Sequence, residues 1–166
     1  MAHTMGRILA NRIQQTKPFD GPAHEAMLNL FIAGAHVRRA IEQVCRSYDL
    51  QFSHYNVLRI LRGAHPEGYA RCDIIDRMLD PSPDVTRLMD KLEDLGCVER
   101  SRSEADRRVT LHTITDAGVA LLERMDPDIQ AVQDSFAASV SDRDLAHLSR
   151  ICEGIYSNMP DPDADK

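Results

Sequence analysis

The sequence predicts a mainly helical protein that carries one small β-hairpin. Apolar residues recur at alternating spacings of three and four over residues 27–48, a heptad pattern typical of a long helix. Residues 53–61 and 85–95 each place apolar side chains along one face of a shorter helix. Residues 97–114 instead contain two short runs of strand-forming residues around a charged loop, which predicts the hairpin.

The composition is that of an ordinary globular protein. The chain has 166 residues, enough for one domain or for one compact unit with dimerising extensions, and 43% of them are hydrophobic. No apolar run approaches the ~20 residues that span a bilayer, so we expect no membrane partner. The polar, basic N-terminus lacks the apolar stretch of a secretory signal, and we therefore expect a cytoplasmic protein.

Four cysteines lie far apart in the sequence, at Cys45, Cys72, Cys97 and Cys152, and no two form a Cys-x-x-Cys pair. This spacing predicts neither a zinc site nor a disulfide framework, so we expect no metal and no cofactor. Free cysteine is among the most buried residue types, and we interpret these four as small buried side chains. A redox-sensing thiol is the alternative.

The N-terminal part of the chain combines a polar arm with the first helix. The arm covers residues 1–22 and ends in Pro18, Gly21 and Pro22, of which Pro22 suits the first turn of a helix. Residues 23–50 then form this helix, whose regular stripe predicts a mixture of intramolecular core and dimer seam. The stripe consists of Met27, Leu30, Gly34, Val37, Ile41, Val44 and Tyr48.

Two shorter helices follow. Ser53 is the predicted N-cap of the first, which ends before Gly63, Pro66 and Gly68. The second covers roughly residues 71–79. Its inward-facing residues are expected to be Ile74, Ile75 and Met78.

A tight Asp-Pro-Ser-Pro connection leads into the next helix. Ser82 is placed to cap this helix and Pro83 to occupy its first position, while Gly96 suits its C-cap. The apolar stripe is Val85, Leu88, Met89, Leu92 and Leu95.

The hairpin and two further helices complete the chain. Strands are predicted at residues 97–100 and 109–114, joined by a long polar tip. Thr115 caps the following helix, in which Pro127 predicts a kink or break. Ser141 and Asp144 resemble a capping box at the start of the last helix, and residues 160–166 form a disordered tail.

Three short helices followed by a hairpin is the order of a winged helix–turn–helix. A helix fits the DNA major groove, and its first turns contact base edges while the preceding helices support it. On the predicted fourth helix, Thr86, Arg87, Asp90 and Asp94 face outward. The two aspartates would repel phosphates, so the helix is expected to enter the groove by its N-terminus.

Charge is the main argument against a general affinity for polyanions. The net charge is −6, so any DNA contact requires a local basic patch. Such a patch is predicted on the hairpin, and a merely solvated loop is the alternative. Its members are Arg100, Arg102, Arg107 and Arg108.

The segment from Asp84 through the hairpin to Gly118 resembles the multiple-antibiotic-resistance regulator (MarR) family. The matching features are the helix from Asp84, the Asp-x-Arg triplet at Asp106 and Arg108, and the Thr-x-x-Gly entry to the next helix. The resemblance implies a two-fold dimer that binds a pseudo-palindromic operator in double-stranded DNA. Such regulators usually repress nearby genes, and a small phenolic or other anionic ligand often releases them.

The resemblance also implies roles for individual residues. Thr86 and Arg87 match base-contacting positions, whereas Asp106 matches a residue that braces the wing. Many members have Ser-Thr where this chain has Pro83 and Asp84. Asp84 cannot pair with a phosphate. It is expected either to accept a hydrogen bond from a cytosine amino group or to stabilise the helix N-terminus by its negative charge. The expected DNA-binding set is Ser82, Asp84, Thr86, Arg87, Arg102, Arg107 and Arg108.

The expected organisation follows from these roles. Residues 51–115 form the DNA-binding region, and residues 23–50 and 116–159 form the helices of the dimer. A small aromatic acid is expected near the hinge between them. Its candidate residues are His36, Arg39, His54 and Tyr55, although isolated histidines are more often surface or satisfied core groups.

Two other functions are alternatives to DNA binding. A winged helix that docks onto another protein would use the same arginines, and the net acidity of the chain favours it. An enzyme is disfavoured, because the sequence has no G-x-S-x-G, Walker or H-E-x-x-H motif and no metal-ligand cluster.

Overall fold

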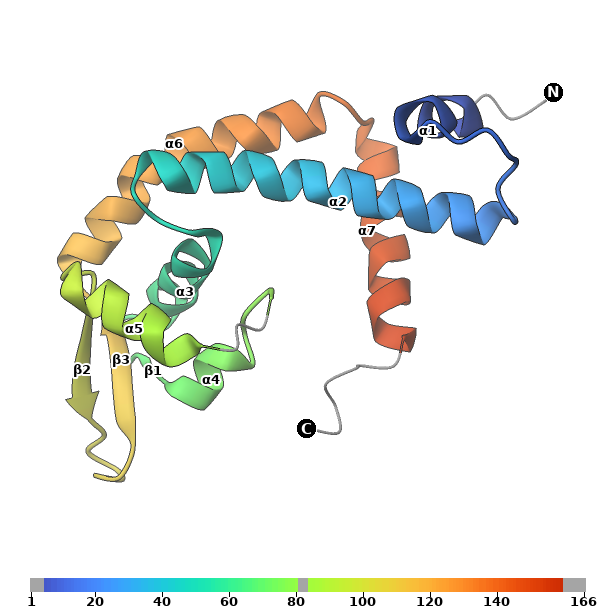
Figure 1. Ribbon diagram of the computed structural model, residues 1–166. Coiled ribbons are helices and arrows are strands. Elements are labelled where there is room, and N and C mark those ends of the chain that lie inside the picture. Colours follow the sequence, from blue (N-terminus) through green and yellow to red (C-terminus); the bar gives the residue numbers. More distant parts are fainter. Residues whose placement is uncertain (1–4, 81–83, 160–166) are drawn as a thin grey trace. The chain divides into compact units, whose positions relative to one another are not determined.

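The computed structural model describes residues 5–80 and 84–159, and it is mainly helical with a three-stranded sheet (Figure 1). This architecture confirms the predicted fold class. Two compact units, Met1–Asp126 and Pro127–Lys166, divide inside helix α6 and are considered separately below. Within the described ranges, no helix is long and apolar enough to cross a membrane.

The polar arm contains a helix that the sequence analysis did not predict. Helix α1 spans Met5–Ile13, and its Leu9 side chain is only 2% exposed. Helix α2 spans Pro22–Ser47 and begins at the predicted proline. The two helices are linked by a hydrogen bond between the Arg12 guanidinium and the His36 imidazole.

Helix α3 spans Phe52–Gly63 and is capped by Gln51, so the prediction of Ser53 as its N-cap is wrong. The reason is local hydrogen bonding. Nδ1 of His54 accepts the backbone N–H of Gln51 at 3.0 Å, which places Phe52 and Ser53 inside the first turn.

Helix α4 is shorter than predicted, because it spans Arg71–Ile75 and not residues 71–79. The side-chain oxygen of the buried Asn56 accepts the backbone N–H of Leu79 at 2.9 Å, which stabilises a non-helical path there. Ile74 and Met78 are buried as predicted, whereas Ile75 is 36% exposed and its predicted burial is wrong.

Helix α5 spans Val85–Asp94, and its N-cap is Asp84. The observed cap is therefore Asp84, whereas the sequence predicted Ser82 as the cap and Pro83 as the first helical residue. Ser82 and Pro83 themselves lie outside the described part of the chain. Val85, Leu88, Met89 and Leu92 are buried, whereas Leu95 is 41% exposed. Gly96 follows with a φ of 68°, a conformation that favours glycine at a helix C-terminus.

The sheet has the strand order β1-β3-β2 and is antiparallel throughout. Strand β2 spans Val98–Arg102, strand β3 spans Thr110–Ile114, and the register pairs Val98 with Ile114. Strand β1, Tyr69–Ala70, was not predicted. It pairs with His112 and Leu111 of β3.

The core of the winged region collects aliphatic side chains from every surrounding element. These side chains come from α3, α4, α5, both hairpin strands and α6, so the hairpin is packed onto the helices at its base. The main members are Leu58, Leu61, Ile74, Met89, Leu92, Val98, Ile114, Leu122 and Met125.

Helix α6 spans Asp116–Ala137 and is capped as predicted. The Thr115 hydroxyl accepts the N–H of Gly118 at 3.2 Å and donates to the carbonyl of Gly96 at 2.7 Å. Pro127 lies inside the helix without ending it, so of the two predicted alternatives, a kink or a break, the break is wrong.

Helix α7 spans Asp142–Asn158, and Ser141 is its N-cap as predicted. None of the described residues of α7 is buried within the single chain. Leu148, Ile151 and Ile155 thus leave an apolar face without cover.

Candidate nucleic-acid interface

The first turn of α5 presents two of the predicted base-contacting residues to solvent. Thr86 is exposed, and the Arg87 side chain is 86% exposed. Asp84 contacts Arg87 twice. One carboxylate oxygen accepts the backbone N–H of Arg87 at 3.1 Å, and the other lies 3.3 Å from its Nε. Of the two roles considered for Asp84, this geometry shows the one at the helix N-terminus.

Arg71 is a residue at this face that the sequence analysis missed. It is the first residue of α4, and its Nη1 donates a hydrogen bond to the Thr86 hydroxyl at 3.1 Å. The two residues are fifteen positions apart in the chain, and no local pattern links them.

Arg100 joins the wing to the far side of α5. It forms ion pairs with Asp90 and with Glu93, the latter at 3.1 Å. The hydrogen bond that Arg100 donates to the Asp90 carboxylate raises the pKa of Arg100 further above its usual range. Asp90 is thus partly neutralised by the wing, which reduces the repulsion of phosphates expected from its position.

Two side chains hold the wing tip through hydrogen bonds to its backbone. The Asp106 carboxylate accepts the N–H of Arg108 at 2.9 Å, and Arg102 donates to the carbonyl of Arg107 at 3.0 Å. Arg102, Arg107 and Arg108 are all exposed. The carboxylate at Asp106 therefore contacts the Arg108 backbone and leaves the Arg108 guanidinium available.

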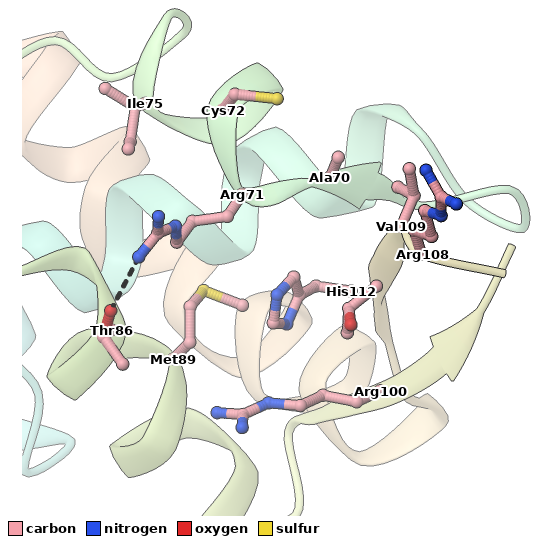
Figure 2. Close-up of a pocket in the computed structure, with 11 residues that line it drawn as sticks. Ala70, Arg71, Cys72, Ile75, Thr86, Met89, Arg100, Arg108, Val109 and His112 are labelled. Atoms are coloured by element: carbon pink, nitrogen blue, oxygen red, sulfur yellow. Dashed lines mark hydrogen bonds between the residues drawn. The ribbon is translucent and has the colours of Figure 1, made fainter. Parts of the chain in front are cut away.

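A cavity of about 500 Å³ lies between α4, α5 and the hairpin (Figure 2). Thr86 on α5 and Arg108 on the wing both line it, so the helix and the wing present these side chains to the same side of the winged region. Arg71, Arg100 and His112 also line the cavity, and the three arginines, Arg108 included, give it a cationic lining suited to anionic groups.

His112 is the buried polar member of this cavity. It is 6% exposed, and in the described part of the chain its Nδ1 has no hydrogen-bond partner. Burial lowers the pKa of His112, and the nearby charge of Arg100 lowers it further.

The four candidate ligand residues occupy two different environments. His36 and Arg39 are exposed on α2, where Arg39 donates to the carbonyl of Ala35. His54 and Tyr55 are buried on α3, and the Tyr55 hydroxyl accepts from Arg59 at 3.1 Å. None of the four lines the cavity described above.

The four cysteines also occupy different environments, two of them buried and two accessible to solvent. Cys45 and Cys97 are buried as expected, whereas Cys72 is exposed and Cys152 is half-buried. Burial raises the pKa of the Cys45 thiol to about 11 and also raises the pKa of Cys97. Both buried thiols are therefore protonated and poorly reactive at neutral pH.

Comparison with known proteins decides the family. A family model described as transcriptional regulator SarA/Rot matches residues 39–125. The HTH-type transcriptional regulator MhqR of Bacillus subtilis is 30% identical over 138 residues, which cover 81% of this chain and 94% of MhqR. The crystal structure of a MarR transcription factor from Planctomyces limnophilus is 34% identical, with a TM-score of 0.63, over 82% of this chain and 98% of that one.

The chain belongs to the MarR family of transcriptional regulators. Two more distant MarR-like structures share its fold. MepR of S. aureus, solved in complex with DNA, has a TM-score of 0.70 at 18% identity and covers 79% of this chain and 96% of its own. CouR from Rhodococcus jostii RHA1, solved with p-coumaroyl-CoA, has a TM-score of 0.70 at 24% identity and covers 86% and 99%.

Membership of the MarR family makes the chain a DNA-binding regulator of transcription and not an enzyme. This agrees with the lack of catalytic motifs in the sequence. The helix from Asp84 and the Asp106–Arg108 triplet, on which the MarR resemblance was based, correspond in the structure to α5 and to the tip of the wing.

Proposed function

We propose that the protein is a homodimeric repressor in the cytoplasm that binds a pseudo-palindromic operator through α5 and the wing. Thr86 and Arg87 contact base edges in the major groove. Arg102, Arg107 and Arg108 contact the backbone beside it. Asp106 keeps the wing in shape through the Arg108 backbone, and Ser82 completes the set expected from the sequence.

The observation that carries this proposal is the common orientation of α5 and the wing. Thr86 and Arg108 line the same cavity, and Arg87 on the same helix turn is almost fully exposed. Exposed arginines beside a helix of groove width are suited to DNA, because guanidinium groups bind both guanine edges and phosphates. MepR, a protein of the same fold, was solved on DNA.

The dimer is supported by apolar side chains that the single chain leaves uncovered. On α2, Met27 and Leu30 of the heptad stripe are exposed, and Phe31 beside them is 68% exposed. On α7, Ile151 is 51% exposed. Two copies of the chain would bury these faces and place two winged regions on successive half-sites of one operator.

Release by a small anionic or phenolic ligand is the second part of the proposal. CouR was solved with p-coumaroyl-CoA, an anionic phenolic conjugate. Among the candidate residues, His54 and Tyr55 are buried, whereas His36 and Arg39 are exposed and are therefore those able to bind an anion directly. Salicylate should raise the melting temperature of the wild type and not of His36→Ala. Equal shifts in both proteins would remove His36 from the ligand site.

The experiment that tests DNA binding is selection of genomic fragments by the purified full-length protein. We expect enrichment of a short inverted repeat, protected on both half-sites in a footprint. Half-site centres about one helical turn apart, or a multiple of it, are expected for a two-fold dimer. Failure to enrich any sequence at low salt would contradict the proposal.

Docking onto a protein with no DNA binding is the second candidate, because the chain carries a net charge of −6. Salt separates the two functions. A DNA complex with several phosphate contacts loses affinity steeply as ionic strength rises. A docking module would show no binding to operator-length DNA even at low salt.

A further inference from the structure

We propose that Arg71 is a phosphate-binding residue of the DNA interface, supplied by α4 and not by the recognition helix or the wing. The inference rests on the proposed operator binding and extends it to a residue that no sequence motif indicates. The two neighbouring residues then have different roles: Arg71 binds the DNA backbone, and Thr86 beside it contacts a base.

The first argument is position. Arg71 is exposed, and its side chain extends from the start of α4 to the first turn of α5, where Nη1 lies 3.1 Å from the Thr86 hydroxyl oxygen (Figure 2). Any DNA that reaches Thr86 therefore comes within reach of the Arg71 guanidinium. Arg71 and Thr86 also line the same cavity as Arg108 of the wing tip.

The second argument is charge. Each of the other guanidinium groups along α5 faces a carboxylate: Arg87 pairs with Asp84, and Arg100 pairs with Asp90 and Glu93. For Arg71, no ion pair with a carboxylate occurs among residues 5–80 and 84–159. Its positive charge is therefore not offset by an acidic partner in the described part of the protein.

The third argument is hydrogen-bonding capacity. Guanidinium has five N–H donors and no acceptor, and the bond to Thr86 uses one of them. The remaining donors of this exposed side chain can exchange water for phosphate oxygens, which match both the charge and the fork geometry of the guanidinium. Because the Thr86 oxygen accepts from Arg71, the hydroxyl proton points elsewhere and can be donated to a base edge.

The test replaces single operator phosphates by neutral methylphosphonates and measures affinity for four proteins. Wild type, Arg71→Ala, Arg71→Lys and the control Arg77→Ala are titrated against each modified duplex. Arg77 is a suitable control, because it follows the same helix and carries the same charge. It stacks on Tyr69 and donates to the carbonyl of Asp73 at 2.7 Å.

We expect one phosphate in each half-site at which the substitution weakens wild-type and Arg77→Ala binding by roughly tenfold. Arg71→Ala should bind unmodified DNA correspondingly more weakly and be insensitive to substitution at that phosphate. Its salt slope should fall by about one for each lost contact, and Arg71→Lys should retain most of the slope. Circular dichroism should show an unchanged fold, because Arg71 is exposed.

Three results would overturn the inference. The first is an Arg71→Ala protein that responds to every methylphosphonate as the wild type does. The second is an Arg71→Ala affinity equal to that of Arg77→Ala. The third is a loss of affinity that depends on a single base pair. Wild-type protein that binds no DNA would instead contradict the proposed function itself, so the two failures are distinguishable.

Discussion

Arg87 illustrates how individual side chains at this interface are held before DNA arrives. Its guanidinium is exposed but lies 3.3 Å from the Asp84 carboxylate, which also caps the helix. An exposed pair of this kind contributes little to stability, since solvent screens it. DNA therefore competes with a weak internal partner, and the pair restricts the conformations that Arg87 samples.

Replacement of Arg87 by alanine should weaken binding to the selected operator by about 1–3 kcal/mol and reduce discrimination at one base position. Competition titrations against operators with single base changes measure both effects. Asp84→Asn is the companion variant, because asparagine also caps helices but removes the competing charge. It should bind DNA at least as tightly as the wild type. An Arg87→Ala protein with unchanged affinity and unchanged base preference would contradict the assigned contact.

His112 predicts a dependence of stability on pH. Burial lowers its pKa in the folded protein below the ordinary value of 6.5, and burial likewise lowers the pKa of His54. Between the folded and unfolded pKa values the unfolded chain binds more protons, so acid favours unfolding. The free energy of unfolding should be nearly constant between about pH 7 and 8 and should fall as the pH drops below 6.5.

Chemical denaturation at pH 7.5 and pH 5.5 measures this effect. The decrease should be smaller in His112→Gln than in the wild type, because the variant has one fewer buried imidazole to protonate. An equal decrease in the two proteins would show that His112 does not contribute.

At the scale of elements, the wing is stabilised at its base by the core and at its tip by polar contacts. Val98 and Ile114 face each other at the buried end of the hairpin. At the tip, Asp106 and Arg102 hold the backbone around Arg107. The arginine side chains there project from a defined loop, which lowers the entropy lost when they bind DNA.

Arg107→Ala should weaken binding to all DNA sequences to a similar extent and reduce the salt slope by about one per half-site. Affinities measured from 50 to 200 mM salt give the slope. Arg150→Ala, which removes the same charge from α7, should leave the slope unchanged. A loss limited to particular operator bases would instead indicate that Arg107 contacts a base.

The start of α6 depends on a glycine. A Cβ at Gly118 would lie 2.4 Å from the carbonyl oxygen of Cys97 and 2.7 Å from the Ile114 side chain. Gly118→Ala should therefore destabilise the fold by about 1–3 kcal/mol, as overpacking typically does. Thermal and urea unfolding measure the change. Gly63→Ala, where nothing lies within 4 Å of the added carbon, should be neutral or slightly stabilising. Similar results for the two variants would contradict the packing argument.

At the scale of the whole molecule, apolar faces on both compact units lack cover within one chain. Leu30 and Phe31 on α2 and Ile151 on α7 are large and exposed. Exposed apolar patches of this kind usually mark association sites. The heptad stripe of α2 changes from exposed at Met27 to half-buried at Ile41, as expected for a helix that contributes to both a core and a seam.

Leu30→Glu and Ile151→Glu should each shift the protein from dimer toward monomer, because a charge in a closed apolar seam has no partner. Sedimentation velocity at several concentrations measures the shift, and operator affinity should fall in parallel. Leu79→Glu is the control, since Leu79 is 77% exposed and lies outside both faces. If all three variants sediment as the wild type does, neither face forms the dimer.

The sequence predicted the elements whose signals are local. Pro22, Thr115 and Ser141 mark three helix starts correctly, because capping residues and first-turn prolines act within a few positions. It did not distinguish Ser82 from Asp84 as a cap, since both residue types accept the same backbone hydrogen bond. Helix α1 was missed because it has no long apolar stripe that a sequence pattern could reveal. The tertiary packing of Leu9 stabilises it instead.

By itself, then, the sequence determined the order of the helices from α2 onward and of the hairpin, the exposed face of α5 and the family of the protein. The tertiary structure alone decided that Arg71 lies beside Thr86, that Arg100 neutralises Asp90, and that β1 joins the sheet. These contacts join positions ten to forty-three residues apart. Propensity and periodicity act over one or two helical turns, so they carry no information about which distant side chains meet.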